Sequence, residues 1–207
     1  MNHFTTTMLV CGIMLAALPA ARADTTCPPN PSPGSTVNGN LIVPGGQTCT
    51  LLTVTVTGNV QVQTNAVLIL VAGGPSKIVG NVSVGTGATV DTGNGTLTID
   101  GNLVANQCLG VLLGEEFAVG GNVQIQNCTG ESDVVSGDIG GNVGCNNSGT
   151  CDVSSDKVNG NVQINDNSSA QVLNNTIGNN LQCQGNAAIT GGGNTVGGQK
   201  MGQCAHF

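Results

Sequence analysis

The feature that most constrains this chain is a Gly-Asn pair that returns about every twenty residues. The pair opens the phrases GNVQV at 58–62 and GNVQI at 121–125 and 160–164. Successive registers are 19 to 22 residues apart, and their Asn residues are Asn40, Asn59, Asn81, Asn102, Asn122, Asn142, Asn161 and Asn180. A step of this size is typical of a solenoid, in which each repeat forms one coil and stacks on its neighbours.

Three positions around each Asn are apolar. Three residues before the Asn stand Val37, Val56, Ile78, Ile99, Val119, Ile139, Val158 and Ile177. One residue after it stand Leu41, Val60, Val82, Leu103, Val123, Val143, Val162 and Leu181. Three residues after it stand Val43, Val62, Val84, Ala105, Ile125, Cys145, Ile164 and Cys183. The last two sets alternate with polar residues, the period of a strand with one buried face. Helix signals are nearly absent, so about 20 residues per turn predict three short strands and their bends.

The glycine before each Asn predicts a bend that needs either positive φ or a close approach of two backbones. Asn179 takes the place of this glycine in the last register. Strands of successive coils pair about 4.8 Å apart, so equivalent residues stack on one another. We therefore expect the eight Asn residues to form a structural amide ladder that satisfies backbone groups at the bends.

Coils of about 20 residues with stacked Asn resemble the right-handed parallel β-helix proteins. The step also varies, unlike the uniform turns of the hexapeptide repeats in left-handed β-helices. The closing phrase GNNLQCQGNAAITGGGNTVGGQKMGQC at 178–204 resembles the ending of small exported bacterial β-helix proteins that are uncharacterised. The resemblance implies an all-β, right-handed parallel β-helix of about eight turns with disulfide-pinned ends, and it implies no activity.

The chain divides into four expected segments. Residues 1–23 hold an apolar run, 8–18, and the small-residue site Ala21-Arg22-Ala23, which predict a secretory signal peptide cleaved before Asp24. Residues 24–36 form a Pro-rich N-terminal cap, 37–199 the β-helix repeats and 200–207 the C-terminal cap. The caps are expected because a coil of strands exposes an unpaired edge at each end. We accordingly expect a secreted or periplasmic protein without a membrane span.

Eight cysteines remain after the predicted cleavage, and an even number in an exported chain indicates disulfides. Cys108 and Cys128 both lie six residues after their Asn in adjacent turns, so stacking brings their Cα atoms within bridging range. A solenoid brings only neighbouring segments together, which favours sequential pairing. The predicted pairs are Cys27 with Cys49, Cys108 with Cys128, Cys145 with Cys151, and Cys183 with Cys204.

Charge and composition narrow the function. The predicted mature chain has three lysines, no arginine and eleven acidic residues, a formal net charge of −8 that disfavours nucleic acid and anionic lipid. The best-known enzymes on the resembled fold are pectate lyases, which use an Arg or Lys base beside calcium-binding Asp, and polygalacturonases, which need clustered Asp with a His and a basic residue. Here the lysines are far apart, and the one remaining histidine, His206, lies next to the terminus.

The acidic residues provide few candidate sites. Glu115 and Glu116 are adjacent, so on a strand they point to opposite faces and cannot converge on one bond. Glu131, Asp133 and Asp138 lie in one irregular stretch, and clustered hard oxygen ligands suit calcium. We name these three as candidate ligands of a weak calcium site; no other cofactor and no catalytic residue is expected.

A binding surface is the remaining candidate. Gln occupies four of the eight positions between the two buried residues of the repeated strand: Gln61, Gln124, Gln163 and Gln182. We therefore expect an exported, non-enzymatic β-helix that presents a structural, adhesive or interaction surface to a polymer or protein of the cell envelope or matrix. A polysaccharide-active lyase or glycoside hydrolase on the same fold is the alternative. Ice binding is a minor alternative, suggested by TVTVT at 53–57 and TLT at 96–98.

Overall fold

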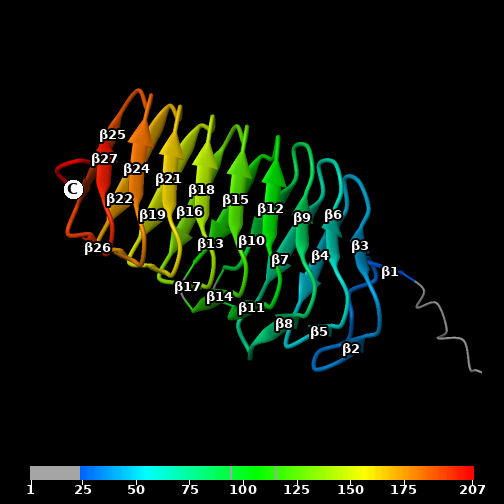
Figure 1. Cartoon of the computed structure of the whole chain (residues 1–207). Helices are drawn as coiled ribbons and strands as arrows, with labels where there is room; N and C mark the ends of the chain where they lie inside the picture. Colours follow the sequence, from blue (N-terminus) through cyan, green and yellow to red (C-terminus); the bar gives the residue numbers. More distant parts are fainter. Residues whose placement is uncertain (1–23, 94, 115) are drawn as a thin grey trace, which may run out of the picture.

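The protein is described here by a computed structural model that covers residues 24–93, 95–114 and 116–207; the predicted signal peptide lies outside the described residues. The described chain forms 27 strands. These strands build three parallel sheets that run side by side along the molecule (Figure 1). The protein is therefore an all-β parallel solenoid, as the repeat predicts, and its count of about nine coils is close to the predicted eight. Within the described residues, no helix offers the length and apolarity needed to cross a membrane.

Sheet A carries the repeated Gly-Asn-Val phrase and faces the viewer in Figure 1. Its ten strands, in spatial order, are β1 (Thr25–Thr26), β3 (Leu41–Val43), β6 (Val60–Val62), β9 (Val82–Val84), β12 (Leu103–Asn106), β15 (Val123–Gln126), β18 (Val143–Asn146), β21 (Val162–Asn165), β24 (Leu181–Gln184) and β27 (Lys200–Gly202). Each strand pairs in parallel with the strand one coil before and the strand one coil after it.

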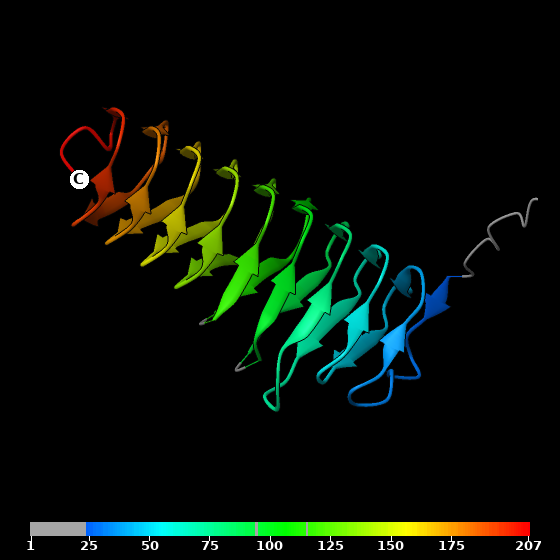
Figure 2. The ribbon, with the colours of Figure 1, turned by 60° about the horizontal axis from the view of Figure 1, so that its bottom comes forward.

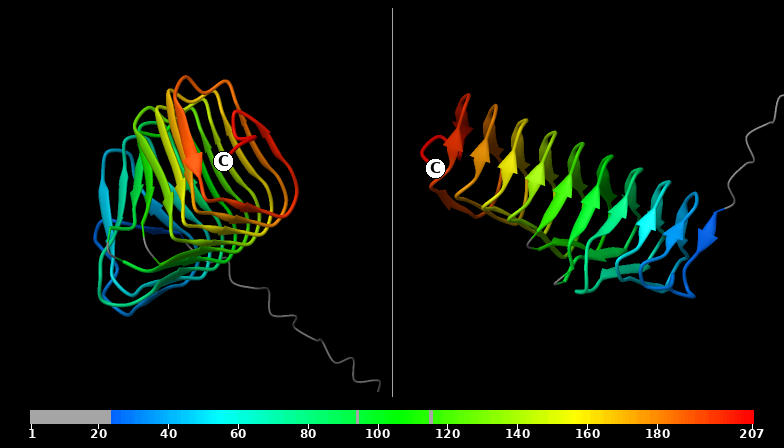
Figure 3. Two further views of the ribbon diagram at one scale, coloured as in Figure 1. Left: turned by 90° about the vertical axis from the view of Figure 1, so that its left-hand side faces the viewer. Right: turned by 90° about the horizontal axis from the view of Figure 1, so that it is seen from below.

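Sheets B and C complete each coil. Sheet B consists of β2 (Thr36–Val37), β5 (Thr55–Val56), β8 (Ser76–Ile78), β11 (Leu97–Ile99), β14 (Phe117–Val119), β17 (Asp138–Ile139), β20 (Lys157–Val158), β23 (Thr176–Ile177) and β26 (Thr195–Val196). Sheet C consists of β4 (Thr48–Leu51), β7 (Val67–Leu70), β10 (Thr89–Asp91), β13 (Gly110–Leu113), β16 (Glu131–Val135), β19 (Thr150–Ser154), β22 (Ser169–Leu173) and β25 (Ile189–Gly192). Figure 2 shows the coils as a regular stack, and Figure 3 shows their three-sided outline from the C-terminal end.

The core is a column of stacked apolar side chains inside the coils. The predicted position three residues before each Asn lies in sheet B, and the two positions after it lie in sheet A; all of these side chains are buried. Sheet C adds alternate residues such as Leu68, Val111 and Val153, which are fully buried. Because no coil can enclose a core alone, burial depends on the neighbouring coils.

The eight predicted Asn residues form a continuous ladder along one edge of sheet A. The Oδ1 atom of each accepts hydrogen bonds from the backbone N–H and from the Nδ2 of the next Asn, with donor–acceptor distances of 2.8 to 3.2 Å. Gln199 continues the series, since its backbone N–H donates to Asn180 at 2.9 Å. The ladder thus satisfies one backbone donor at every bend.

The glycines that precede these Asn residues serve close approach rather than positive φ. Among those seven glycines, positive φ occurs only at Gly39. At Gly58 and Gly80, an added Cβ would lie 2.6 Å from the Oδ1 of the Asn one coil earlier. Positive φ instead occurs at turns between sheets, for example at Asn127 and Asn147. A side chain at the glycine position would therefore push the ladder apart.

Two further ladders inside the last coils were not predicted. Asn167 and Asn186 form one, and Asp156, Asn175 and Asn194 form the other; all five side chains are buried. Each buried Asn donates through Nδ2 to a backbone carbonyl 22 residues earlier, as Asn175 does to Val153 at 2.7 Å. The 19-residue spacing of these residues is visible in the sequence, but in a register outside the Gly-Asn alignment.

The four disulfides join the cysteines in the predicted pairs. Their Cα–Cα distances are 5.4 Å for Cys27 and Cys49, 4.4 Å for Cys108 and Cys128, 6.6 Å for Cys145 and Cys151, and 5.3 Å for Cys183 and Cys204. The first and last pairs lie near the two ends of the stack. At the C-terminal end, Lys200 Nζ donates to the Asn194 carbonyl at 2.8 Å and to the Phe207 carbonyl.

Candidate functional surface

The outer face of sheet A carries the four predicted Gln residues, but they do not form one continuous row. Gln61, Gln124 and Gln163 are exposed and Gln182 is half-buried. Gln163 and Gln182 are register neighbours, whereas Gly144 separates Gln124 from Gln163. Between Gln61 and Gln124 the same row contains Ser83 and Val104. The four Gln residues thus share the outward row of sheet A with other residues, as their positions in the repeat predict.

A second row of amides runs beside the first and was missed by the prediction. It occupies the position four residues after six of the eight ladder Asn residues and consists of Gln63, Asn106, Gln126, Asn146, Asn165 and Gln184, while Pro44 and Gly85 stand there in the other two registers. Asn165 Nδ2 donates to Asn146 Oδ1 at 3.0 Å, so part of this row is ordered by contacts between coils. The signal was available as an amide residue directly after the second buried position in six of the eight repeats.

The strands that form this face are uncharged except for the last one. No strand of sheet A from β1 to β24 contains Asp, Glu, Lys, Arg or His, and Lys200 in β27 is the first ionisable residue of the sheet. The acids of the strands lie on the other sides: Asp91, Glu131, Asp133 and Asp152 on sheet C, and Asp138 on sheet B. The solenoid therefore has one neutral amide-rich side on an acidic body.

Shallow depressions lie along this neutral side. One, of about 370 Å³, follows the Asn ladder at Asn40, Asn59 and Asn81 and is also lined by Asp24; a second, of about 450 Å³, lies at Gly85. A third, of about 270 Å³, is lined by Gln124, Gln126, Asn142, Val143, Gly144, Asn146, Asn161 and Gln163. We call this third depression the Gly144 notch. Its side-chain lining contains amides and one valine, and no charged group.

The acidic residues on sheet C form a separate electrostatic feature. Asp133 and Asp152 are register partners on adjacent strands, and both are half-buried. Burial, with added repulsion from Glu131 and Asp152, raises the pKa of Asp133 to about 6. Ser154 Oγ donates a hydrogen bond to Asp152 Oδ1. The pair can hold and release a proton, but it lines none of the depressions described above.

Asp156 is buried, with only 2% of its surface exposed. Its Oδ1 accepts from the Gly137 N–H at 2.8 Å, while its Oδ2 is buried without a partner. Burial raises its pKa to about 8; the Gly137 hydrogen bond opposes this rise and the Asp152 charge adds to it. At neutral pH the Asp156 side chain is therefore mainly a neutral acid inside the coil.

The predicted calcium ligands are not brought together. Glu131 and Asp133 lie on β16 in sheet C, whereas Asp138 lies on β17 in sheet B, where its carboxylate faces Lys157 Nζ at 3.8 Å. Among the described residues, no group of three His, Cys, Asp or Glu side chains is arranged to hold a metal ion. The prediction failed because the bend between β16 and β17 separates residues that are close in sequence.

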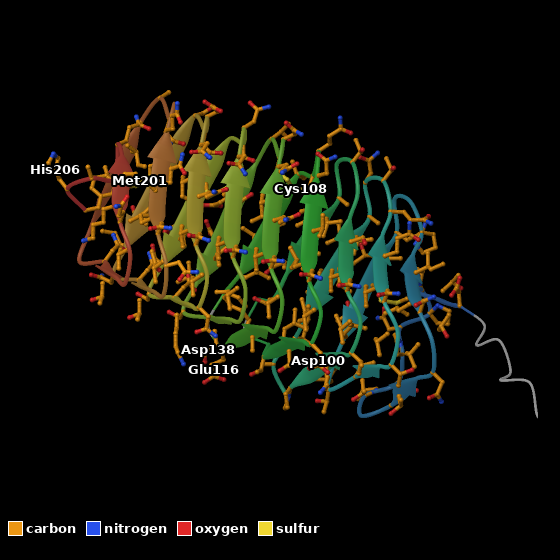
Figure 4. The ribbon with its side chains drawn as sticks, in the orientation of Figure 1. Asp100, Cys108, Glu116, Asp138, Met201 and His206 are labelled. Carbon is orange, nitrogen blue, oxygen red and sulfur yellow. A yellow bond between two sulfur atoms is a disulfide. The ribbon has the colours of Figure 1, made fainter. Side chains whose placement is uncertain are left out.

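Other predicted features also separate in space. Glu116 is exposed in a turn with positive φ, Glu115 lies outside the described residues, and Phe117 is buried in the core. His206 lies at the C-terminal end, far from Asp100, Glu116 and Asp138 along the lower edge (Figure 4). No cluster of acids with a histidine is formed by these labelled residues.

The threonines behind the ice-binding alternative do not form a continuous ladder. Thr55 and Thr98 face outward in sheet B, but Lys77 lies between them in register. Ala118 and Asp138 follow Thr98 in the same row, where a depression of about 370 Å³ opens. Charged and small residues therefore interrupt the regular threonine array that ice binding needs.

Comparisons with known proteins leave the function to be argued from these surfaces. No protein-family model, curated protein or solved structure matches the chain.

Proposed function

We propose that this protein is an exported, non-enzymatic solenoid that attaches to a polymer or protein of the cell envelope or matrix through the outer face of sheet A. The observation that carries the proposal is the separation of a neutral, amide-rich side from an otherwise acidic surface. Asn and Gln side chains offer both donors and acceptors, and a solenoid repeats them at intervals of about 4.8 Å. Weak contacts repeated along such a face add to a useful affinity.

Export is supported by the four disulfides, which fit an oxidising compartment. The predicted signal peptide points the same way. We place the protein in the periplasm or outside the cell.

Charge on the proposed face provides the test. Replacing Gln124, Gln163 and Gln182 by Glu preserves side-chain shape and adds three negative charges to the outer face of sheet A. The matched control replaces Thr98, Thr176 and Thr195 by Glu on the outer face of sheet B. Co-sedimentation with envelope and matrix fractions of the producing cells should fall for the first variant and stay unchanged for the control. Equal binding of both variants and wild type would rule out sheet A as the attachment face.

A polysaccharide-active enzyme is the second candidate, and the Asp133 and Asp152 pair favours it. A carboxyl group with a raised pKa beside a second carboxylate is the general arrangement of acid–base glycoside hydrolysis. The test is the release of reducing ends or unsaturated sugars from pectin, alginate, hyaluronan, chitin or cellulose. Product formation that Asp133→Asn abolishes would establish this enzyme and overturn the non-enzymatic proposal.

A further inference from the structure

The Gly144 notch is an interruption in an amide surface. Gly144 occupies the outward position between Gln124 and Gln163, its register partners on the two adjacent strands. Asn142 and Asn161 of the ladder close one side of the notch. The glycine therefore leaves a recess between amide side chains.

The amides around the notch differ in how free they are. Asn142 and Asn161 are held by the ladder, since the Oδ1 of Asn142 accepts from the backbone and side chain of Asn161 at 2.8 and 3.0 Å. The side chains of Gln124 and Gln163 make no hydrogen bond to another described residue. Fixed Asn side chains thus line the notch together with Gln donors and acceptors that no other described residue engages.

The chemistry of this lining selects a neutral, hydroxyl-bearing ligand. Every amide offers both a donor and an acceptor, as hydroxyl and acetamido groups do. The notch contains no cation that could pair with a carboxylate or sulfate, and the formal net charge of the chain, −7, repels polyanions. Its volume of about 270 Å³ is close to the lower limit for small-molecule pockets, so it suits one protruding substituent.

We propose that a neutral polysaccharide lies along the outer face of sheet A, with one hydroxyl-bearing or acetamido substituent seated in the Gly144 notch between Gln124 and Gln163. This inference rests on the proposed function, because it names the partner class of the same face. The rows of amides along the coils give successive sugar units similar contacts, and the notch supplies one specific position.

The fold allows a direct test at the glycine itself. Gly144 does not have positive φ, and an added Cβ would meet only Asn146 Nδ2, at an ordinary contact distance of 3.5 Å. Gly144→Gln therefore fills the notch and completes the Gln row without strain. Ala118→Gln is the matched control, because it fills the depression on sheet B with the same side chain.

The experiment measures binding of the mature protein and both variants to insoluble chitin and cellulose, with alginate beads as the anionic comparison. We expect wild type to bind at least one neutral polysaccharide and not alginate. Gly144→Gln should weaken that binding about tenfold, the loss expected when one or two hydrogen bonds are removed. Ala118→Gln should bind as wild type does, and circular dichroism should show the same fold for all three proteins.

Each contrary result has a distinct meaning. Unchanged binding by Gly144→Gln would overturn the notch and leave the proposed attachment face standing. Binding to alginate as strong as to chitin or cellulose would overturn the neutral-ligand argument. Failure of wild type to bind either neutral polysaccharide, together with glutamate-sensitive attachment to envelope fractions, would overturn the polysaccharide and keep the proposed function. Loss of self-association in Gly144→Gln, without glycan binding, would identify a second copy of this chain as the occupant and overturn the proposal.

Discussion

Replacing Asp156 by Asn should make the protein less sensitive to alkaline pH. Asp156 stands at the head of a buried ladder with Asn175 and Asn194 at 19-residue intervals. In the two Asn residues, Nδ2 donates to the carbonyls of Val153 and Val172. For Asp156 the carbonyl in the equivalent position belongs to Val134, the register partner of Val153 one coil earlier. An ionised carboxylate cannot donate to that carbonyl, whereas a protonated acid or an Asn amide can.

The raised pKa of Asp156 determines whether stability rises or falls with pH and over which pH range it changes. Burial raises the pKa of Asp156 from 3.8 to about 8, so between these values the folded state binds the proton more tightly than the unfolded state. The free energy of unfolding therefore falls as pH rises from about 4 to about 8. At about 1.4 kcal/mol per pKa unit the full change is roughly 6 kcal/mol, and relaxation with water entry lowers the measurable part. We expect Asp156→Asn to exceed wild type by at least about 2 kcal/mol at pH 8.5.

Urea denaturation followed by far-ultraviolet circular dichroism is the suitable assay, because the chain has no Trp or Tyr. The interval from pH 7 to pH 8.5 isolates Asp156, since the pKa of Asp133 is raised only to about 6 and Asp133 is nearly fully ionised above pH 7. Wild type should lose stability across this interval, and Asp156→Asn should lose much less. Parallel pH profiles for the two proteins would refute the view that a protonated carboxyl replaces an amide in this ladder.

Four further outcomes are expected from changes to the coils. Gly121→Ala should destabilise the fold by about 1–3 kcal/mol in urea denaturation, because the new Cβ would meet ladder and backbone atoms of the previous coil; an unchanged midpoint would contradict close approach. Asn142→Ala should cost about 1–3 kcal/mol by removing the acceptor of a ladder bond, with faster amide exchange at the next bend as the second readout. Replacing Cys108 and Cys128 together by Ser should cost about 2–4 kcal/mol in urea denaturation; an unchanged midpoint would contradict a stabilising bridge between these coils. Deleting residues 24–36, with the freed cysteine changed to Ser, should expose the edge of the first coil and give oligomers or fibres by light scattering; a monomer of unchanged stability would argue against capping.

The repeat along the chain was enough to predict the coil. The three apolar positions around each Asn specify which side chains turn inward, since a strand alternates its faces and stacked coils must match. The Asn ladder and three of the four disulfide pairs follow from the same rule, because a solenoid brings together residues one repeat apart. Cys145 and Cys151, six residues apart, instead close a short loop. These features depend on local period and spacing, which the sequence contains in full.

The lateral neighbours on the surface were decided only by the tertiary structure. The steps between coils vary from 19 to 22 residues, and the extra residues lie in the bends. The neighbour of an outward residue on the next coil is therefore not at a constant distance in the sequence. Asp133 thus lies beside Asp152, while Asp138, only five residues away in sequence, turns onto another sheet. Likewise, Gly144 becomes a notch only because two Gln side chains flank it one coil away on either side. Side chains are buried only when neighbouring coils stack on one another. The neutral carboxyl group of Asp156 and the amide-lined recess therefore depend on this stacking and could not be derived from the sequence alone.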